Sequence, residues 1–263
     1  MRPNRLRQTW AEGGHVVCGW LSIPNSYTAE VMARMGFDAL CIDMQHGLID
    51  YGDIVPMLQA ISQTETVPIA RVPWNDPAIM MKVLDAGAYG VIVPLINNRA
   101  EAERAVQACR YPPMGFRSYG PIRASAYGGA DYAEHANEEI LVLAMIETAD
   151  GLANLDEICS TPGLSGVYIG PSDLGYALGL APKMDSEVPV HVEAVARILA
   201  ACKRHNIICG IHTGGVAFSK RFIEQGMHLV TLTSDAGSLA LGARQQLAQV
   251  RADTGAGAAR GTY

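Results

Sequence analysis

The sequence has little of what marks proteins that bind nucleic acids or membranes. It carries 20 Lys and Arg residues against 26 Asp and Glu residues, and no dense basic block. We therefore expect no nucleic acid partner. No apolar run approaches the roughly 18 residues that span a bilayer, and the first residues lack the apolar core of a secretory signal. These absences predict a cytoplasmic protein without a membrane partner.

Cysteine patterns that bind zinc or form disulfide frameworks are also missing. The six cysteines include no CxxC pair, and most of them lie inside apolar runs. We expect reduced, buried thiols rather than a zinc site or a redox pair. The glycine-rich GxGxxG fingerprint of dinucleotide-binding folds does not follow the first apolar run. This absence counts against an open doubly wound sheet.

What the chain does contain is a series of eight short runs rich in Val, Ile and Leu, separated for the most part by segments with helical spacing of apolar residues. The runs are VVCGWLSI, DALCIDM, VPIARV, GVIVPL, ILVLAMIE, GVYIG, IICGIH and HLVTLT. Continuously apolar strands are typical of a parallel sheet that helices cover on both faces. The pattern predicts the α/β class and a (β/α)8 TIM barrel, with an open doubly wound sheet as the alternative.

The domain organisation follows from the same pattern. Residues 1–250 are predicted to form a single barrel domain, and residues 251–263 a disordered tail, because ADTGAGAARGTY has no apolar periodicity. The interval 110–140 is too long for a simple connection, and residues 129–139 within it have the pattern of a short extra helix.

Two carboxylates stand at the ends of neighbouring predicted strands. Glu147 ends the fifth strand, and Asp173 follows the sixth. In a barrel the chemistry gathers at the carboxyl ends of the strands, and two oxygen ligands without cysteine suit a hard ion such as Mg²⁺ or Mn²⁺. The alternative is that both acids cap helices or face solvent.

The second and third strands supply an acid, a base and a cation. Asp43 precedes His46 by one short turn, so the carboxylate could orient the imidazole and raise its basicity as a dyad. The alternative is an ordinary loop histidine. Arg71 ends the third strand, where it is either a surface ion-pair partner or a clamp for an anion or enolate.

Two glycine-containing turns follow the sixth and seventh strands. YIGPSDLG places Gly170, Pro171 and Ser172 before a helix start whose free N–H groups could hold a substrate carboxylate. The glycines that follow His212 in HTGG could cradle a phosphate or make a turn, and the turn is favoured.

Taken together, these segments resemble the HpcH/HpaI aldolases, the metal-dependent class II pyruvate aldolases that include 4-hydroxy-2-oxoheptanedioate aldolase. The resemblance runs from about Gly19 to about Leu241. It rests on GFDALCIDMQHG, RVPWNDP, LDAGAYGVIVPLINN, ACRYPPMGFRS, MIETADGLANLDEI and GVYIGPSDLG, in that order.

The resemblance implies a (β/α)8 barrel, assembled as a hexamer through exchanged C-terminal helices, with a Mg²⁺, Mn²⁺ or Co²⁺ centre. It also implies roles for individual residues. By position, Glu147 and Asp173 match the metal ligands, His46 with Asp43 matches the catalytic dyad, and Arg71 matches the residue that contacts the oxo-acid oxygen. Asp85 matches an acid that the family presents near a neighbouring subunit's site. The backbone at Gly170, Pro171 and Ser172 matches the segment that holds the substrate carboxylate, and Trp20 matches an apolar wall.

Three positions depart from the family pattern. Gln45 stands where many members have Glu, which removes a charge beside the metal, and Met145 stands where some have Gln, which makes that wall apolar. His212 stands where the best-known enzyme has leucine, which suggests a more polar pocket for the aldehyde. None of the three changes removes a ligand.

The implied activity is reversible aldol cleavage between a 2-oxo acid, pyruvate or hydroxypyruvate, and an aldehyde through a metal-bound enolate, without a Schiff-base lysine. Two alternatives remain at this point. One is a thioester lyase of the citrate-lyase β-subunit or malyl-CoA type, and the other is a binding barrel without catalytic activity.

Overall fold

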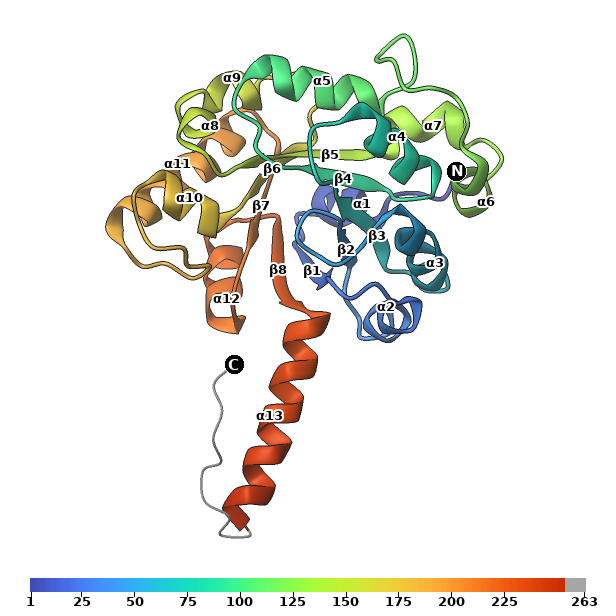
Figure 1. Ribbon diagram of the computed structural model, residues 1–263. Coiled ribbons are helices and arrows are strands. Elements are labelled where there is room, and N and C mark those ends of the chain that lie inside the picture. Colours follow the sequence, from blue (N-terminus) through green and yellow to red (C-terminus); the bar gives the residue numbers. More distant parts are fainter. Residues whose placement is uncertain (254–263) are drawn as a thin grey trace.

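The computed structural model describes residues 1–253, and its centre is a closed parallel barrel with the strand order β1-β2-β3-β4-β5-β6-β7-β8 (Figure 1). Strand β8 pairs with β1 and so closes the barrel. The eight predicted strands and the TIM-like (β/α)8 fold are confirmed. The strands are β1 (Val16–Leu21), β2 (Ala39–Asp43), β3 (Val67–Arg71), β4 (Gly90–Val93), β5 (Leu141–Ile146), β6 (Gly166–Ile169), β7 (Ile208–His212) and β8 (Leu229–Ser234).

Helices connect the strands and cover the outside of the barrel. They are α1 (Arg5–Ala11), α2 (Ser26–Ala33), α3 (Tyr51–Ile61), α4 (Pro77–Asp85), α5 (Arg99–Cys109), α6 (Ile122–Gly128), α7 (Tyr132–Glu139), α8 (Ala149–Ala153), α9 (Leu155–Cys159), α10 (Pro171–Ala177), α11 (Pro189–Arg204), α12 (Val216–Gln225) and α13 (Asp235–Asp253). Within residues 1–253, none of them combines the length and apolarity needed to cross a membrane.

The strands are buried on both faces, as their continuous apolar runs predict. Every residue of β2, β4, β5 and β6 is buried, so side chains that point inward fill the barrel and those that point outward pack under the helices. The six cysteines are free, buried thiols, as expected, with three of them in strands and three in helices. Apolar packing therefore holds the strand ends in fixed positions.

Local sequence signals set several helix starts. The side chains of Asn25, Asp76, Asn98 and Thr148 each accept backbone N–H bonds at the first turn of the helix that follows. The long interval between β4 and β5 contains α6 and α7 in addition to α5, whereas the sequence pattern predicted one extra helix there.

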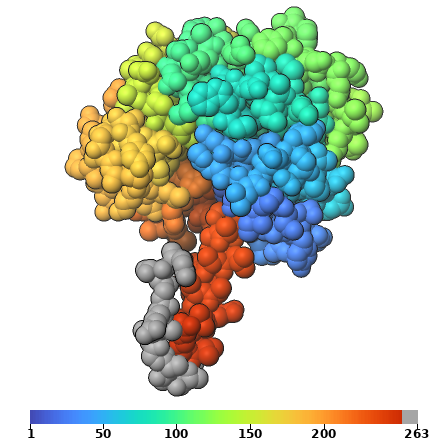
Figure 2. Space-filling model, viewed as in Figure 1, coloured from blue at the N-terminus to red at the C-terminus, as the bar shows by residue number. Residues whose placement is uncertain are grey.

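The last helix differs from the others, because α13 extends away from the barrel (Figures 1 and 2). Its leucines at 239, 241 and 247 are 69%, 58% and 49% exposed. The helix also includes residues 251–253, which the sequence pattern assigned to the disordered tail. The remainder of that predicted tail, residues 254–263, lies outside the described residues.

Candidate active site

Most of the predicted site residues meet at the carboxyl ends of the strands. Trp20 lies near the end of β1, Asp43 ends β2, Arg71 ends β3 and His212 ends β7. Glu147 directly follows β5. Since all eight strands are parallel, these side chains come to the same rim of the barrel.

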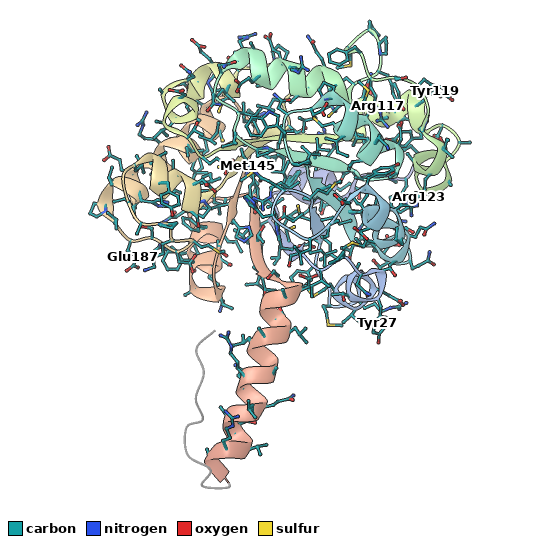
Figure 3. All side chains as sticks on the ribbon, in the orientation of Figure 1. Tyr27, Arg117, Tyr119, Arg123, Met145 and Glu187 are labelled. Atoms are coloured by element: carbon teal, nitrogen blue, oxygen red, sulfur yellow. The ribbon has the colours of Figure 1, made fainter. Side chains whose placement is uncertain are left out.

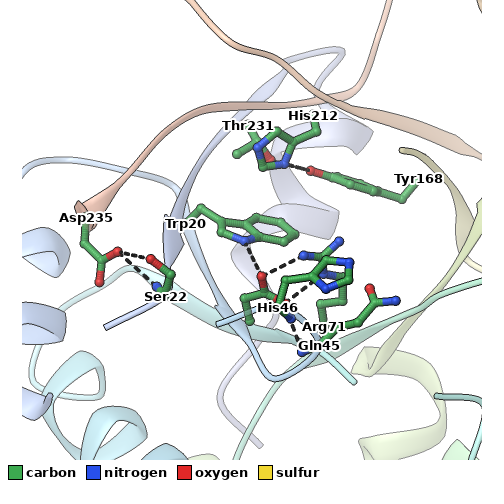
Figure 4. Close-up of polar contacts among 10 residues, drawn as sticks. Trp20, Ser22, Gln45, His46, Arg71, Tyr168, His212, Thr231 and Asp235 are labelled. Carbon is green, nitrogen blue, oxygen red and sulfur yellow. Dashed lines mark hydrogen bonds and ion pairs between the residues drawn. The ribbon is translucent and has the colours of Figure 1, made fainter. Parts of the chain in front are cut away.

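Asp43 is the centre of a hydrogen-bond network at this rim, and Figure 4 labels its partners Trp20, Gln45, His46 and Arg71. The Arg71 guanidinium donates through Nε to Oδ1 at 2.8 Å and through Nη2 to Oδ2 at 2.6 Å. Trp20 donates through Nε1 to Oδ2 at 3.1 Å. The backbone N–H groups of Gln45 and His46 donate to Oδ1 at 3.1 and 3.3 Å. The carboxylate therefore fixes an arginine, an indole and the following loop together.

This network differs from the expected Asp43–His46 dyad. Asp43 binds the backbone N–H of His46 rather than its imidazole, because Trp20 and Arg71 already occupy both carboxylate oxygens. The His46 side chain is exposed at the rim. Asp43 thus shapes the turn that carries His46 but does not orient the imidazole directly.

The ion pair keeps both partners charged although it is buried. Burial by itself would raise the pKa of Asp43, but the hydrogen bonds and positive charge of Arg71 hold that pKa below its usual range. Burial by itself would lower the pKa of Arg71, and Asp43 holds it above the usual range. The guanidinium also lies over the Trp20 ring, 4.9 Å from its centroid. A cation of fixed orientation results.

Glu147 lies in a less compensated environment. It is 3% exposed, and its Oε1 accepts the backbone N–H of Leu95 at 3.0 Å. Burial raises its pKa to about 7, the negative charge of Asp173 adds to that rise, and the Leu95 bond and Arg71 oppose it. Glu147 is therefore a carboxyl group that lacks a strong positive partner.

The turn between β6 and α10 packs directly on Glu147. Gly170 lies so close that a Cβ there would collide with Glu147 Oε2 and would stand 2.9 Å from Met145 Cε. A side chain at this position would force the Glu147 and Met145 side chains to shift. Met145 is fully buried near the centre of the barrel, so the wall beside Glu147 is apolar (Figure 3). Asp173, in the first turn of α10, completes the group of carboxylates on this side.

The donor set fits a hard divalent ion that takes part of its coordination from elsewhere. Glu147 and Asp173 offer two carboxylates, and a cation between them would relieve the raised pKa of Glu147. No group of three or more His, Cys, Asp or Glu side chains within residues 1–253 could hold a metal ion. Water and substrate oxygens would have to supply the other ligands.

A second polar network, which the sequence did not reveal, supports His212. The Tyr168 hydroxyl lies 3.1 Å from His212 Nδ1 and 2.6 Å from Thr231 Oγ1. Trp20 contacts the imidazole edge-on, with ring centroids 4.8 Å apart. Burial, with the nearby Arg71 charge, lowers the pKa of His212 to about 4. Tyr168 and Thr231 come from the strand runs GVYIG and HLVTLT, and nothing in those runs marked the two hydroxyl groups as part of a site.

Two other predicted features lie apart from this group. The Gly214 N–H donates to Asp185 Oδ1 at 2.8 Å, so the HTGG segment forms a turn before α12. Asp85 ends α4, on the amino side of the strands, and its Oδ1 accepts a 2.7 Å bond from the buried Arg117. Figure 3 shows Arg117 far from Met145 at the barrel centre. Within one chain Asp85 does not join the site.

Comparisons with known proteins agree with the family that the sequence resembles. Residues 17–241 match the family model described as HpcH/HpaI aldolase/citrate lyase. The chain is similar to a hydroxypyruvate/pyruvate aldolase of Rhizorhabdus wittichii, with 46% identity over 95% of this chain and 99% of the relative. It is also similar to a 4-hydroxy-2-oxo-heptane-1,7-dioate aldolase of Salmonella dublin, with 38% identity over 93% of each.

A solved structure agrees with the fold. A HpcH/HpaI aldolase/citrate lyase family protein from Burkholderia cenocepacia superposes with a TM-score of 0.88 and 34% identity. The similarity covers 94% of this chain and 99% of that one. Sequence and structure comparisons thus point to the same group of proteins as the strand-end residues.

Proposed function

Because the chain belongs to the HpcH/HpaI aldolase/citrate lyase family, we propose that the rim around Asp43, Arg71 and Glu147 is the active site of its aldolase reaction. The enzyme is a pyruvate-type aldolase, a carbon–carbon lyase. Its reaction is the reversible aldol cleavage and addition that joins a 2-oxo acid to an aldehyde. Relatives named as aldolases over nearly the whole chain favour this activity over a thioester lyase or a binding barrel.

The observation that supports the proposal is that the Arg71 guanidinium, fixed by Asp43, lies near the carboxylates of Glu147 and Asp173, which have no strong positive partner of their own within residues 1–253. Enzymes of this family use divalent metals, and Glu147 with Asp173 would hold Mg²⁺, Mn²⁺ or Co²⁺ here. The bound ion supplies positive charge that favours loss of a proton from the carbon next to the keto group. Arg71 directs its guanidinium toward the same keto oxygen, with its orientation set by Asp43.

The remaining groups bind the substrate and move protons. The backbone at Gly170, Pro171 and Ser172 holds the carboxylate of the 2-oxo acid at the start of α10, where no side chain caps the helix. Trp20 forms a flat wall over Arg71. His46, exposed at the rim, takes or returns the proton of the aldol hydroxyl. His212, which contacts Trp20 edge-on, would line the pocket for the aldehyde portion.

Proton–deuterium exchange at the pyruvate methyl group, followed by NMR in D₂O, tests the proposal without needing an aldehyde. We expect exchange with Mg²⁺ or Mn²⁺ that a chelator and Glu147→Gln both abolish. His46→Ala is expected to lose aldol cleavage. The reaction needs no Schiff-base lysine, so borohydride with pyruvate should not inactivate the protein. Metal-independent exchange, or trapping of pyruvate on a lysine, would contradict this mechanism.

The assembly forms part of the same proposal. An apolar groove of about 550 Å³ runs beside the base of α13, lined among others by Tyr27, Val31, Met35 and Leu239. All four of these side chains are exposed, as are the leucines further along α13. A second copy's α13 is the occupant that matches this groove, so that exchanged C-terminal helices link subunits into a hexamer. Asp85 would then approach a neighbouring subunit's site.

A further inference from the structure

The turn proposed to hold the substrate carboxylate makes a buried contact that the sequence did not predict and that the proposed mechanism does not involve. His191, the third residue of α11, is 3% exposed, and its Nε2 lies 2.9 Å from the carbonyl oxygen of Pro171. A carbonyl oxygen only accepts hydrogen bonds, so Nε2 carries the proton and donates it. The imidazole therefore links the long helix α11 to the first residue of the short helix α10.

The imidazole meets α10 at a second point. A Cβ at Gly175 would lie 3.9 Å from His191 Cδ2, so the ring packs against the glycine face of this helix. Gly170, the residue before Pro171, packs on Glu147, because a Cβ at Gly170 would collide with Glu147 Oε2. Adjacent residues of the turn thus contact His191 and a predicted metal ligand.

We propose that His191 is a positioning residue that fixes the turn from Gly170 to Asp173 against Glu147. Its hydrogen bond to Pro171 sets the direction of the backbone that receives the substrate carboxylate and the distance between Asp173 and Glu147. This inference rests on the proposed function of the turn. His191 itself touches neither substrate nor metal, and it acts only through Pro171.

The chemistry of the site explains why such an anchor is needed. Helix α10 has seven residues and no side-chain cap, so its own hydrogen bonds hold it weakly. Helix α11 has sixteen residues and buries an apolar face that includes Val195, Ile198 and Leu199. The hydrogen bond from His191 of α11 to Pro171 therefore restrains the start of α10. Partners of this kind behind a metal site typically contribute about 10- to 100-fold to affinity or activity.

The test compares His191→Phe, which fills the space without a donor, with His191→Gln, whose amide N–H can reach the carbonyl. We expect His191→Phe to raise the KM for pyruvate and the Kd for Mn²⁺ by about tenfold or more, with a smaller change in kcat. His191→Gln should recover most of both. His135→Phe, at an exposed histidine of α7, is the control and should change neither.

Deuterium uptake measured by mass spectrometry gives a readout that does not depend on activity. Peptides covering residues 166–178 should exchange faster in His191→Phe than in the wild type, and near the wild-type rate in His191→Gln. If His191→Phe does not fold, His191→Asn replaces it, because its shorter amide leaves the carbonyl without a donor.

The outcomes separate this inference from the proposed function. Wild-type uptake and wild-type KM in His191→Phe would overturn the positioning role. Equal losses in the Phe and Gln variants would also overturn it, because packing alone would then explain the effect. If the wild type itself exchanges no pyruvate protons, the proposed function fails, and the uptake measurement alone decides the role of His191.

Discussion

Arg71 and Asp43 form a two-point ion pair in which both carboxylate oxygens accept from the same guanidinium, at 2.8 and 2.6 Å. The β2–β3 register aligns the two residues, so the pairing follows directly from the sheet. Two parallel hydrogen bonds fix the plane of the guanidinium as well as its position. The site therefore presents a charged donor whose direction the barrel itself sets.

Replacing Arg71 by Lys should keep the charge but lose the fixed plane. We expect aldol cleavage measured as kcat/KM to fall on the order of 100-fold, because an ammonium group cannot bind both Asp43 oxygens and a substrate oxygen in the same geometry. Asp43→Asn should show a loss of similar size. The matched control is Arg34→Lys in the exposed Arg34–Glu30 pair, which should leave kcat/KM unchanged. A wild-type rate in Arg71→Lys would mean that charge alone suffices.

The raised pKa of Glu147, about 7, predicts a pH dependence of metal binding. Below that value a proton competes with the ion, so the affinity for Mn²⁺ should fall about tenfold per pH unit. Calorimetric titrations at several pH values would measure this slope. Glu147→Gln should bind Mn²⁺ weakly and show a much smaller slope. A steep slope that survives in Glu147→Gln would assign the titration to another group.

The same shift predicts how the stability of the metal-free protein changes with pH. The folded-state pKa lies above the unfolded value of 4.5, so between these values the folded state binds the additional proton. Glu147 therefore destabilises the fold as the pH rises toward 7 and stabilises it as the pH falls. We expect the Tm of the metal-free protein to decrease across this interval, and Glu147→Gln to show a smaller decrease. Adding Mn²⁺ should oppose the loss at high pH.

The pKa of His212, about 4, means that its imidazole is neutral throughout the usual range of assay pH. His212→Leu should therefore leave the pH profile of pyruvate proton exchange unchanged between about pH 5 and 8. Its effect should appear in the preference between hydroxylated and unsubstituted aldehydes of equal length, because leucine replaces a polar imidazole with an apolar side chain. If the fall in exchange rate at acidic pH disappeared in His212→Leu, this imidazole would instead titrate during the reaction.

Positions of site residues along the chain were predictable, whereas their partners were not. A polar residue after an apolar strand points to the rim, and that rule located Asp43, Arg71, Glu147 and His212. It could not show that Asp43 binds Arg71 rather than the His46 imidazole. The partner of Asp43 depends on the strand register, which places Arg71 beside it, and on the loop geometry, which directs the backbone N–H of His46 to the carboxylate.

Buried polar contacts inside apolar patterns were also beyond the sequence. Tyr168 and Thr231 occupy strand positions that would suit any large or β-branched residue, and their pairing appears only when the closed barrel places β6 and β8 on either side of β7. His191 lies in a helix whose apolar spacing is complete without it.

Gln45 offers a prediction about charge next to the proposed metal site. Its Oε1 is buried without a hydrogen-bond partner among residues 1–253. Gln45→Glu places a carboxylate there, so the metal-free protein should lose roughly 1–3 kcal/mol of unfolding free energy. Mn²⁺ should bind more tightly to this variant than to the wild type and restore its stability. Thermal unfolding with and without Mn²⁺ measures both effects, and equal Tm shifts in variant and wild type would place Gln45 away from the ion.

The exposed leucines of α13 give the sharpest test of the proposed assembly. Leu241→Asp and Leu247→Asp put charges on surfaces that would be buried in a neighbouring copy, so light scattering should show a smaller species than the wild type. Gln246→Asp, at an exposed polar position of the same helix, is the control and should keep the wild-type mass. Activity should fall together with the mass, because Asp85 then no longer reaches a neighbouring site. A wild-type protein that is monomeric and fully active would overturn both the helix exchange and the role of Asp85.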